Sequence, residues 1–480
     1  MSINTEQALL HGDYNTYCST DEDLELKDSH SFLEEFKQLL MATFPLAITF
    51  FLQYAFSITS LIAAGRLGPL ALGAASLALT VFNCFGLSIF QGLSTSLDSL
   101  CAMTFGRQNF FGVGLYFQRC TAIMFTAMIP LIVFWWYSGV FLGLFVQDRD
   151  LVNLAQTFLR WHIVGVPGLI LFEGLKRFLQ SQHIFHAGTY ALAIAVPLNI
   201  ILNWFLVVSE YGLGYIGIPI TIAITYWFMS VLMIGYIYFI DGSKCWGGLQ
   251  LREAFSNWEP MLSLAIPGVI TLISEFLAFE ILVFFAANFP DPASKVSAQA
   301  IVSNIASLLY QVPFSASVAI TTKLSYFIGK KDIYGAKLMI RIFFATAPIM
   351  GVINCLIFVL GRSKLAQLFT DDEVVLNLAT GLNVLAGINQ LCDSFNVLGS
   401  GVLRGMFQYK LSSFLSCFCF YGLAIPLGYI MGFKFHHELF GLWYGLIIGV
   451  FFLALAQVNF ILRSNLKAII ITSHNLHESQ

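Results

Sequence analysis

The chain has 480 residues, of which 58% are hydrophobic and only 11% are charged, and its formal net charge is −3. Soluble domains carry about 25% charged residues, so this composition excludes an ordinary soluble domain and indicates a membrane protein. The slight negative charge also argues against a nucleic-acid partner, because nucleic-acid binders usually depend on clustered basic residues.

The N-terminal segment is polar and acidic, and four of its acidic residues lie between positions 21 and 25. A secretory signal peptide would instead combine a basic start with an apolar run. We therefore expect residues 1–37 to form a disordered cytosolic tail. Residues 464–480 are predicted to form a second tail on the same side.

Twelve apolar runs between these tails are long enough to cross a bilayer, which needs about 20 residues of helix. The sequence thus predicts an all-α polytopic membrane protein. The expected spans are 38–62, 72–97, 116–140, 154–175, 187–209, 215–240, 259–288, 296–320, 339–361, 377–402, 413–433 and 440–462.

The second half of the chain repeats the first. Residues 105–112 (FGRQNFFG) correspond to residues 328–335 (IGKKDIYG), and residues 144–148 (LFVQD) correspond to residues 368–372 (LFTDD). Repeats of six spans keep the same orientation, so an axis along the membrane normal should relate them. We expect two pseudo-symmetric six-helix halves, at residues 38–240 and 259–463, joined by a cytosolic linker at residues 241–258.

The positions of Lys and Arg predict the orientation. With the N-terminus in the cytosol, seventeen of these residues fall on the inner side and seven on the outer side, which together are the 24 of the chain. Because basic residues concentrate on the cytosolic side of membrane proteins, both termini are expected there.

Two carboxylic acids interrupt apolar spans. Glu275 lies inside the run from residue 265 to residue 287, and Asp393 lies inside a later span. A carboxylate near the centre of a span costs about 2.5–3.5 kcal/mol, so it normally faces a cavity and has a function there. Glu280 lies five residues after Glu275 and is rotated by about 140° on an ideal helix. For Glu280, coupling and a simple interhelical hydrogen bond are both open.

Polar residues follow these acids at helical spacing. Asn389, Asp393 and Asn396 fall on one face of the tenth span. Asn304, Ser307 and Gln311 fall on one face of the eighth span, where they could instead hold helices together by hydrogen bonds. Gln53 is the repeat partner of Glu275 in the first half. We interpret the five amides and the serine as lining a substrate cavity.

Enzymatic signatures are missing from the sequence. The nine cysteines are scattered, and His436 and His437 have only Glu438 beside them, which are too few ligands for a metal site. No phosphate-binding loop or nucleophile elbow is present. We expect no catalytic residues, no metal and no cofactor.

Four segments together resemble the multidrug and toxic compound extrusion (MATE) family, in particular its eukaryotic branch. They are residues 92–101 (GLSTSLDSLC), 197–203 (PLNIILN), 274–280 (SEFLAFE) and 392–405 (CDSFNVLGSGVLRG). The chain departs from the family at Ala102, Met103, Lys323 and Tyr326, in expected cytosolic loops. The resemblance implies transport of an organic cation in exchange for a proton or sodium ion bound by Glu275 and Asp393. Some bacterial members use an aspartate in the first span, which has none here.

We therefore predict a monomeric antiporter in the lipid bilayer that exports small organic molecules, organic cations above all, from the cytosol in exchange for protons, with sodium less favoured. A proton on Glu275 or Asp393 would remove the charge that holds the cation. An acidic organelle or the cell surface supplies a suitable gradient, so we expect the vacuolar or the plasma membrane. The alternative is a flippase for a lipid-linked or amphipathic substrate, although acidic intramembrane charges suit anionic headgroups poorly.

Overall fold

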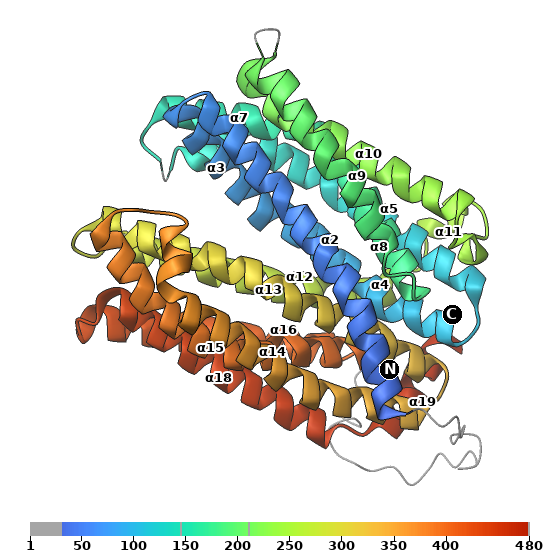
Figure 1. The fold of residues 1–480 in the computed structure, drawn as a ribbon. Coiled ribbons are helices and arrows are strands. Elements are labelled where there is room, and N and C mark those ends of the chain that lie inside the picture. Colours follow the sequence, from blue (N-terminus) through green and yellow to red (C-terminus); the bar gives the residue numbers. More distant parts are fainter. Residues whose placement is uncertain (1–30, 145, 210–211, 479–480) are drawn as a thin grey trace.

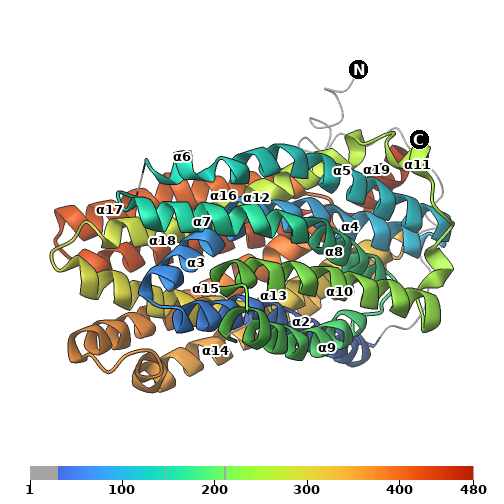
Figure 2. The same ribbon diagram turned by 90° about the horizontal axis from the view of Figure 1, so that it is seen from above.

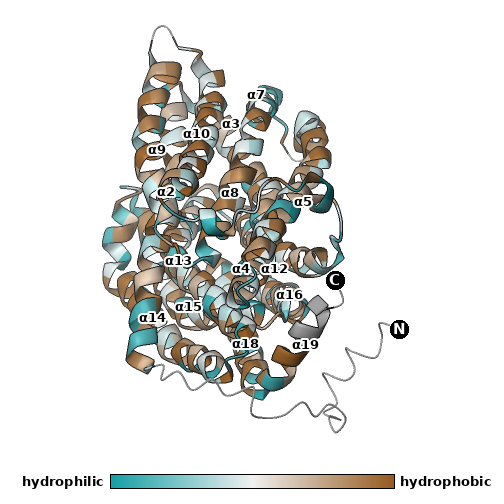
Figure 3. Ribbon diagram, turned by 90° about the vertical axis from the view of Figure 1, so that its right-hand side faces the viewer, coloured by the Kyte–Doolittle hydropathy of each residue, from teal (hydrophilic) through white to brown (hydrophobic). Residues whose placement is uncertain are grey.

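A computed structural model describes residues 31–144, 146–209 and 212–478, and in this part of the chain every regular element is helical. Twelve helical segments there are long and apolar enough to cross a membrane, which confirms the predicted all-α polytopic architecture. Hydrophobic residues dominate their ribbons (Figure 3). The first thirty residues of the predicted tail lie outside the described residues.

The N-terminal half holds six of the twelve spans, several of them built from consecutive helices. Its elements are α2 (Phe32–Arg66), α3 (Pro69–Phe82), η2 (Asn83–Leu87), α4 (Ser88–Gly106), α5 (Phe110–Trp136), α6 (Ser138–Leu142), α7 (Arg149–His162), η3 (Ile163–Gly165), α8 (Val166–Ser181), α9 (Ala187–Asn203), η4 (Trp204–Val208), η5 (Gly214–Ile216) and α10 (Gly217–Phe239). The connection to the second half contains η6 (Ser243–Cys245) and α11 (Leu251–Ala254).

The C-terminal half holds the other six spans and ends in an additional helix. Its elements are α12 (Glu259–Ala286), α13 (Pro292–Gly329), α14 (Ile333–Gln367), α15 (Glu373–Gly405), α16 (Tyr409–Cys417), η7 (Phe418–Ala424), α17 (Ile425–Tyr429), η8 (Ile430–Lys434), α18 (Glu438–Arg463) and α19 (Leu466–Glu478). Figure 1 shows the halves as two layers, with α2 beginning and α19 lying on the same side of the molecule. We call this the terminal side.

The observed helices extend beyond the predicted spans. The first begins at Phe32 rather than at residue 38, the eighth continues to Gly329 rather than to residue 320, and α19 lies where a tail was expected. Polar residues in these turns lower the hydropathy without breaking the helix. One example is Glu35, which is 6% exposed because it packs inside the bundle.

The repeat noted in the sequence is a repeat of helix starts. Asn109 Oδ1 accepts from the Gly112 amide at 3.0 Å before α5, and Asp332 Oδ1 accepts from the Gly335 amide at 2.8 Å before α14. An aspartate likewise caps both α7 and α15. Such caps satisfy amides that have no partner inside the helix. The two halves therefore share their turns as well as their spans.

The halves meet through α4 of the first and α12 and α13 of the second, which Figure 2 shows from above. Near the terminal side the contact is reciprocal. A Cβ added to Gly106 would lie 2.3 Å from the Tyr326 carbonyl oxygen, and one added to Gly329 would lie 2.1 Å from the Met103 carbonyl oxygen. Each glycine lets the other half's backbone approach closely, so the two ends pack together. In Figure 1 the ribbons of the two halves diverge toward the end of the molecule where α3 and α7 are labelled.

Candidate functional site

Glu275 lies on α12 at a small pocket inside the C-terminal half. Tyr310 Oη on α13 donates a hydrogen bond of 3.2 Å to Glu275 Oε2. The pocket has a volume of about 10 Å³, close to the space that one water molecule needs. Its lining residues are Thr271, Leu272, Glu275, Tyr310, Phe314, Asn396, Val397, Ser400, Arg404, Ser416 and Phe420. The pocket suits a proton or a water molecule rather than an organic molecule.

Asp393 lies on α15 within electrostatic reach of Glu275. It is 9% exposed, and Asn396 Nδ2 donates to its Oδ1 at 3.2 Å. Gln457 on α18 donates in turn to Asn396 Oδ1 at 3.1 Å and to Ser400 Oγ at 3.0 Å. This chain of amides fixes the position of Asp393 without placing a cation beside it.

The remaining predicted site residues are dispersed. Of the amides and the serine, only Asn396 lines the pocket of Glu275. Asn389 is buried, and its Oδ1 has no hydrogen-bond partner among the described residues. Asn304 Oδ1 accepts from Tyr54 Oη of the other half at 3.2 Å. Ser307 is exposed, and its carbonyl oxygen accepts from Gln311 Nε2 at 3.1 Å.

Glu280 lies on another side of α12 from Glu275. It is exposed and forms no hydrogen bond or ion pair with any described residue. Its carboxyl group is within electrostatic reach of Cys84 at the start of the bent segment between α3 and α4. Glu280 therefore faces the N-terminal half.

Gln53 belongs to a buried polar cluster in the N-terminal half. Its Nε2 donates to Glu173 Oε1 at 2.8 Å, and Lys176 Nζ donates to Gln53 Oε1 at 3.2 Å. Lys176 also forms an ion pair of 2.9 Å with Glu173. The next residue, Arg177, forms an ion pair with Asp98 of α4.

Glu173 of this cluster is fully buried in α8. The sequence signal that could have located the cluster is its balance of charge. Membrane helices α4 and α8 carry two acids, Asp98 and Glu173, and α8 carries two bases at adjacent positions, Lys176 and Arg177. Paired charges of this kind serve mainly to satisfy each other.

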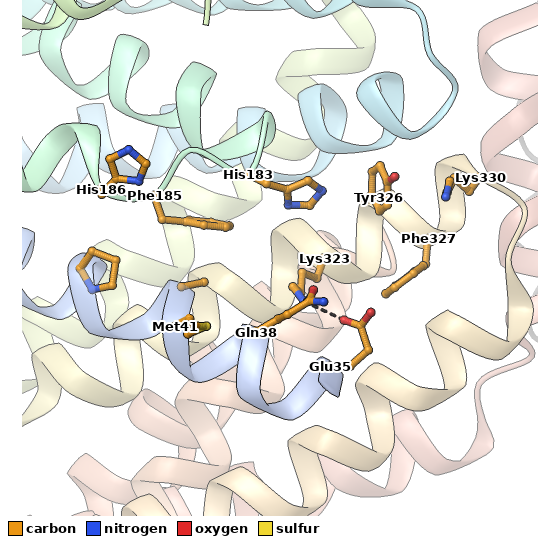
Figure 4. Close-up of a pocket in the computed structure, with 12 residues that line it drawn as sticks. Glu35, Gln38, Met41, His183, Phe185, His186, Lys323, Tyr326, Phe327 and Lys330 are labelled. Carbon is orange, nitrogen blue, oxygen red and sulfur yellow. Dashed lines mark hydrogen bonds and ion pairs between the residues drawn. The ribbon is translucent and has the colours of Figure 1, made fainter. Parts of the chain in front are cut away.

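A larger cavity of about 460 Å³ lies between the halves on the terminal side (Figure 4). Lys323 of α13 crosses it, donating to Glu35 Oε2 at 2.7 Å and Gln38 Oε1 at 2.8 Å on α2. His183, in the turn between α8 and α9, points toward Tyr326, and the two rings meet edge to face. Burial and, to a smaller extent, nearby Lys323 lower the pKa of His183 to about 4. These contacts join the halves on this side.

In the described ranges no group of three or more His, Cys, Asp or Glu side chains is arranged to hold a metal ion.

Comparisons with known proteins agree with this architecture. A family model described as MatE matches residues 45–205 and 267–430. The chain is 37% identical over 458 residues to the uncharacterized transporter YDR338C of Saccharomyces cerevisiae, an alignment that covers 95% of this chain and 65% of that protein's length. It is 29% identical over 437 residues to Protein DETOXIFICATION 16 of Arabidopsis thaliana, covering 90% and 89% of the two chains.

Solved structures show the same fold. The eukaryotic MATE transporter AtDTX14 superposes with a TM-score of 0.88 at 24% identity, covering 92% of this chain and 99% of that one. The Vibrio cholerae MATE transporter VcmN in its bent form gives a TM-score of 0.79 at 15% identity, covering 93% and 99%. Together with the family match, these findings show that the chain belongs to the MatE family of membrane transporters and is not an enzyme.

Proposed function

We propose that this transporter exports organic cations in exchange for protons, and that Glu275 and Asp393 couple the two movements. The observation that carries the proposal is the pair of interacting acids inside the C-terminal half, whose hydrogen-bond donors, Tyr310 and Asn396, are both uncharged. A proton can add to either acid without breaking an ion pair. Addition of a proton to Asp98 or Glu173 would break one.

Proton and cation then compete for the same negative charge, the proton inside the pocket of Glu275 and the organic cation outside it, because that pocket has room for about one water molecule. When the acids are ionised they attract a cation, and when they are protonated that attraction is lost, so each ligand lowers the affinity for the other. Sodium is less favoured as the coupling ion only because the chain resembles the eukaryotic branch of the family, since hydroxyl and amide oxygens also line the pocket of Glu275. We propose that Glu280 attracts the cation from the space facing the N-terminal half.

The direction of transport follows from the orientation. With both termini in the cytosol, as the distribution of basic residues favours, the terminal side is cytosolic. Its close contacts then correspond to a state that is closed toward the cytosol. Acid on the opposite side, in a vacuole or outside the cell, would protonate the site and release the cation there. We propose that one chain suffices, because a single buried apolar cluster runs through both halves of the chain.

Uptake by proteoliposomes tests the proposal. Purified protein is reconstituted, a pH gradient with the acidic side inside the vesicle is imposed, and ethidium accumulation is followed by fluorescence. Wild-type protein should accumulate ethidium only when the gradient is present, and Glu275→Gln should lower the initial rate at least about a hundredfold, because the coupling proton has lost its acceptor. Gradient-driven uptake by Glu275→Gln at the wild-type rate would contradict the assignment.

Two further variants sharpen the result. Glu259→Gln changes an exposed acid at the start of the same helix, and it should transport like the wild type. Glu280→Gln should remain gradient-driven but need more ethidium to reach half its maximal rate, since it loses an attracting charge. The amount of each variant in the membrane is measured in parallel by gel filtration and immunoblotting.

A further inference from the structure

Arg404 is a buried cation that borders the pocket of Glu275. It is 6% exposed, and its Nη2 donates to Ser317 Oγ of α13 at 2.9 Å. Its Nε has no hydrogen-bond partner among the described residues, and no described Asp or Glu forms an ion pair with it. A buried charge that forms no ion pair is costly, so its position calls for a functional explanation.

The repeat shows what Arg404 lacks. The stretch EGLKR at residues 173–177 on α8 corresponds to SGVLR at residues 400–404 on α15, so Arg177 is the repeat partner of Arg404. Asp98, the ion-pair partner of Arg177, corresponds to Thr321 at the offset of 223 that separates the repeated turns. The Thr321 hydroxyl donates to the carbonyl oxygens of Ser317 and Gly401 at 2.9 and 2.8 Å. The C-terminal half thus keeps the arginine and replaces its acid by a hydroxyl.

The charge of Arg404 therefore remains available to the site. It lies within electrostatic reach of Glu275, with which it shares the pocket. Asp98, which also lies within electrostatic reach of Arg404, forms an ion pair with Arg177, and Glu173 forms one with Lys176, so the charges within each pair cancel. With both acids ionised, the site holds Glu275, Asp393 and Arg404, which sum to one negative charge. With both acids protonated, it holds one positive charge.

We propose, on the basis of the proposed function, that Arg404 sets the charge selectivity of the site. One net negative charge matches a singly charged cation, and a doubly charged cation would leave the site with an excess positive charge. The same arginine repels the bound cation once the acids are protonated, which makes release more complete than the loss of attraction alone. Arg404 is thus a specificity-determining residue, because it offsets one of the two negative charges of the coupling acids.

The size of the effect follows from Coulomb's law. A unit charge removed at about 6–10 Å from a bound cation, with an effective dielectric constant of about 20, changes the affinity by roughly tenfold to a hundredfold, and by the square of that factor for a dication. The ratio of the two affinities should therefore change by at least about tenfold when the charge of Arg404 is removed or paired.

Binding of ethidium and propidium to purified protein in lipid nanodiscs tests this inference. The two dyes share one ring system but carry one and two positive charges. Their dissociation constants are measured by fluorescence polarisation at pH 8. Arg404→Gln should shift the affinity ratio toward propidium by about tenfold or more. Thr321→Asp should do the same with the arginine still in place, because it supplies the acid that the N-terminal half has at Asp98.

Two controls keep the charge. Arg404→Lys should preserve the wild-type ratio, and Ser317→Ala, which removes only the hydrogen bond to Arg404, should preserve it too. An unchanged ratio in both Arg404→Gln and Thr321→Asp, with ethidium still bound, would overturn the inference and leave the proposed function standing. Wild-type protein that binds neither dye would overturn the proposed function together with the inference.

Discussion

At the scale of single residues, the two halves differ in the side chains that surround their buried acids. Asp98 and Glu173 lie against basic side chains, whereas Glu275 and Asp393 receive hydrogen bonds from a phenol and an amide. A neutral donor accommodates a carboxyl group in both of its protonation states, because hydrogen bonds can be kept when the proton adds. The ion-paired acids of the N-terminal half are therefore suited to stabilising the fold, and the acids of the C-terminal half are suited to exchanging protons.

His183 gives a pH prediction at this scale. Its pKa is lowered from the usual value of 6.5 to about 4, mainly by burial. Folding therefore favours the neutral ring, and the resulting stability is present above pH 6.5 and is lost as the pH falls from 6.5 toward 4. We expect thermal unfolding in detergent to show a loss on the order of 1 kcal/mol per pH unit in this window.

The matched variant is His183→Asn, since His183 has a positive φ of 64° and asparagine tolerates that conformation. Its stability should fall less steeply than that of the wild type between pH 6.5 and 4. Parallel unfolding curves for the two proteins over this range would contradict the buried neutral ring.

Some site residues were visible in the sequence, and others depended on the fold. Glu275 and Asp393 stand out because a carboxylate within an apolar run is unusual wherever the run packs. The partner of Gln53 could not be predicted in the same way, because the repeat relates it to Glu275 whereas folding brings it to Glu173. Helical spacing likewise placed Asn304 and Ser307 on one face without indicating what that face contacts. The roles of these residues in substrate binding stay predictions.

At the scale of elements, the turn residues predict where helices begin more accurately than the apolar runs predict where they begin and end. Residues 108 and 331 both have positive φ, and each precedes the side chain that caps the next helix. The sequence revealed this repeat, and with it the two halves, because the turn residues serve the backbone directly. Helix lengths were underestimated where a helix continues with polar residues that the bundle buries, as α2 does at Glu35.

Packing of the two halves gives a prediction at this scale. Gly329→Ala would place a methyl group 2.1 Å from the Met103 carbonyl oxygen, so the ends of α4 and α13 would have to separate. We expect a lower melting temperature in detergent, corresponding to about 1–3 kcal/mol, the usual cost of overpacking. Gly235→Ala on α10 is the control, because a Cβ there meets nothing within 4 Å.

Alanine favours helix over glycine, so Gly235→Ala should keep or slightly raise the melting temperature. If both variants melted at the same temperature as the wild type, close packing between α4 and α13 would not hold the halves together in solution.

At the scale of the whole molecule, the halves share one architecture and differ in charge. The N-terminal half encloses paired charges, and the C-terminal half encloses two acids and an arginine with no ion-pair partner among the described residues. The halves contact each other closely on the terminal side, through Gly106, Gly329 and the bonds of Lys323. Two rigid halves joined at one end can rock to open the opposite end, which is the motion that alternating access requires.

The most direct test of the central claim is to measure both movements in one vesicle. Proteoliposomes with a pH-sensitive dye inside receive ethidium on the outside with no initial pH gradient. The account predicts that ethidium entry drives protons out, seen as a rise in internal pH, and that Glu275→Gln and Asp393→Asn abolish this rise. Ethidium entry without any proton movement in the wild type, or an undiminished rise in both variants, would contradict it.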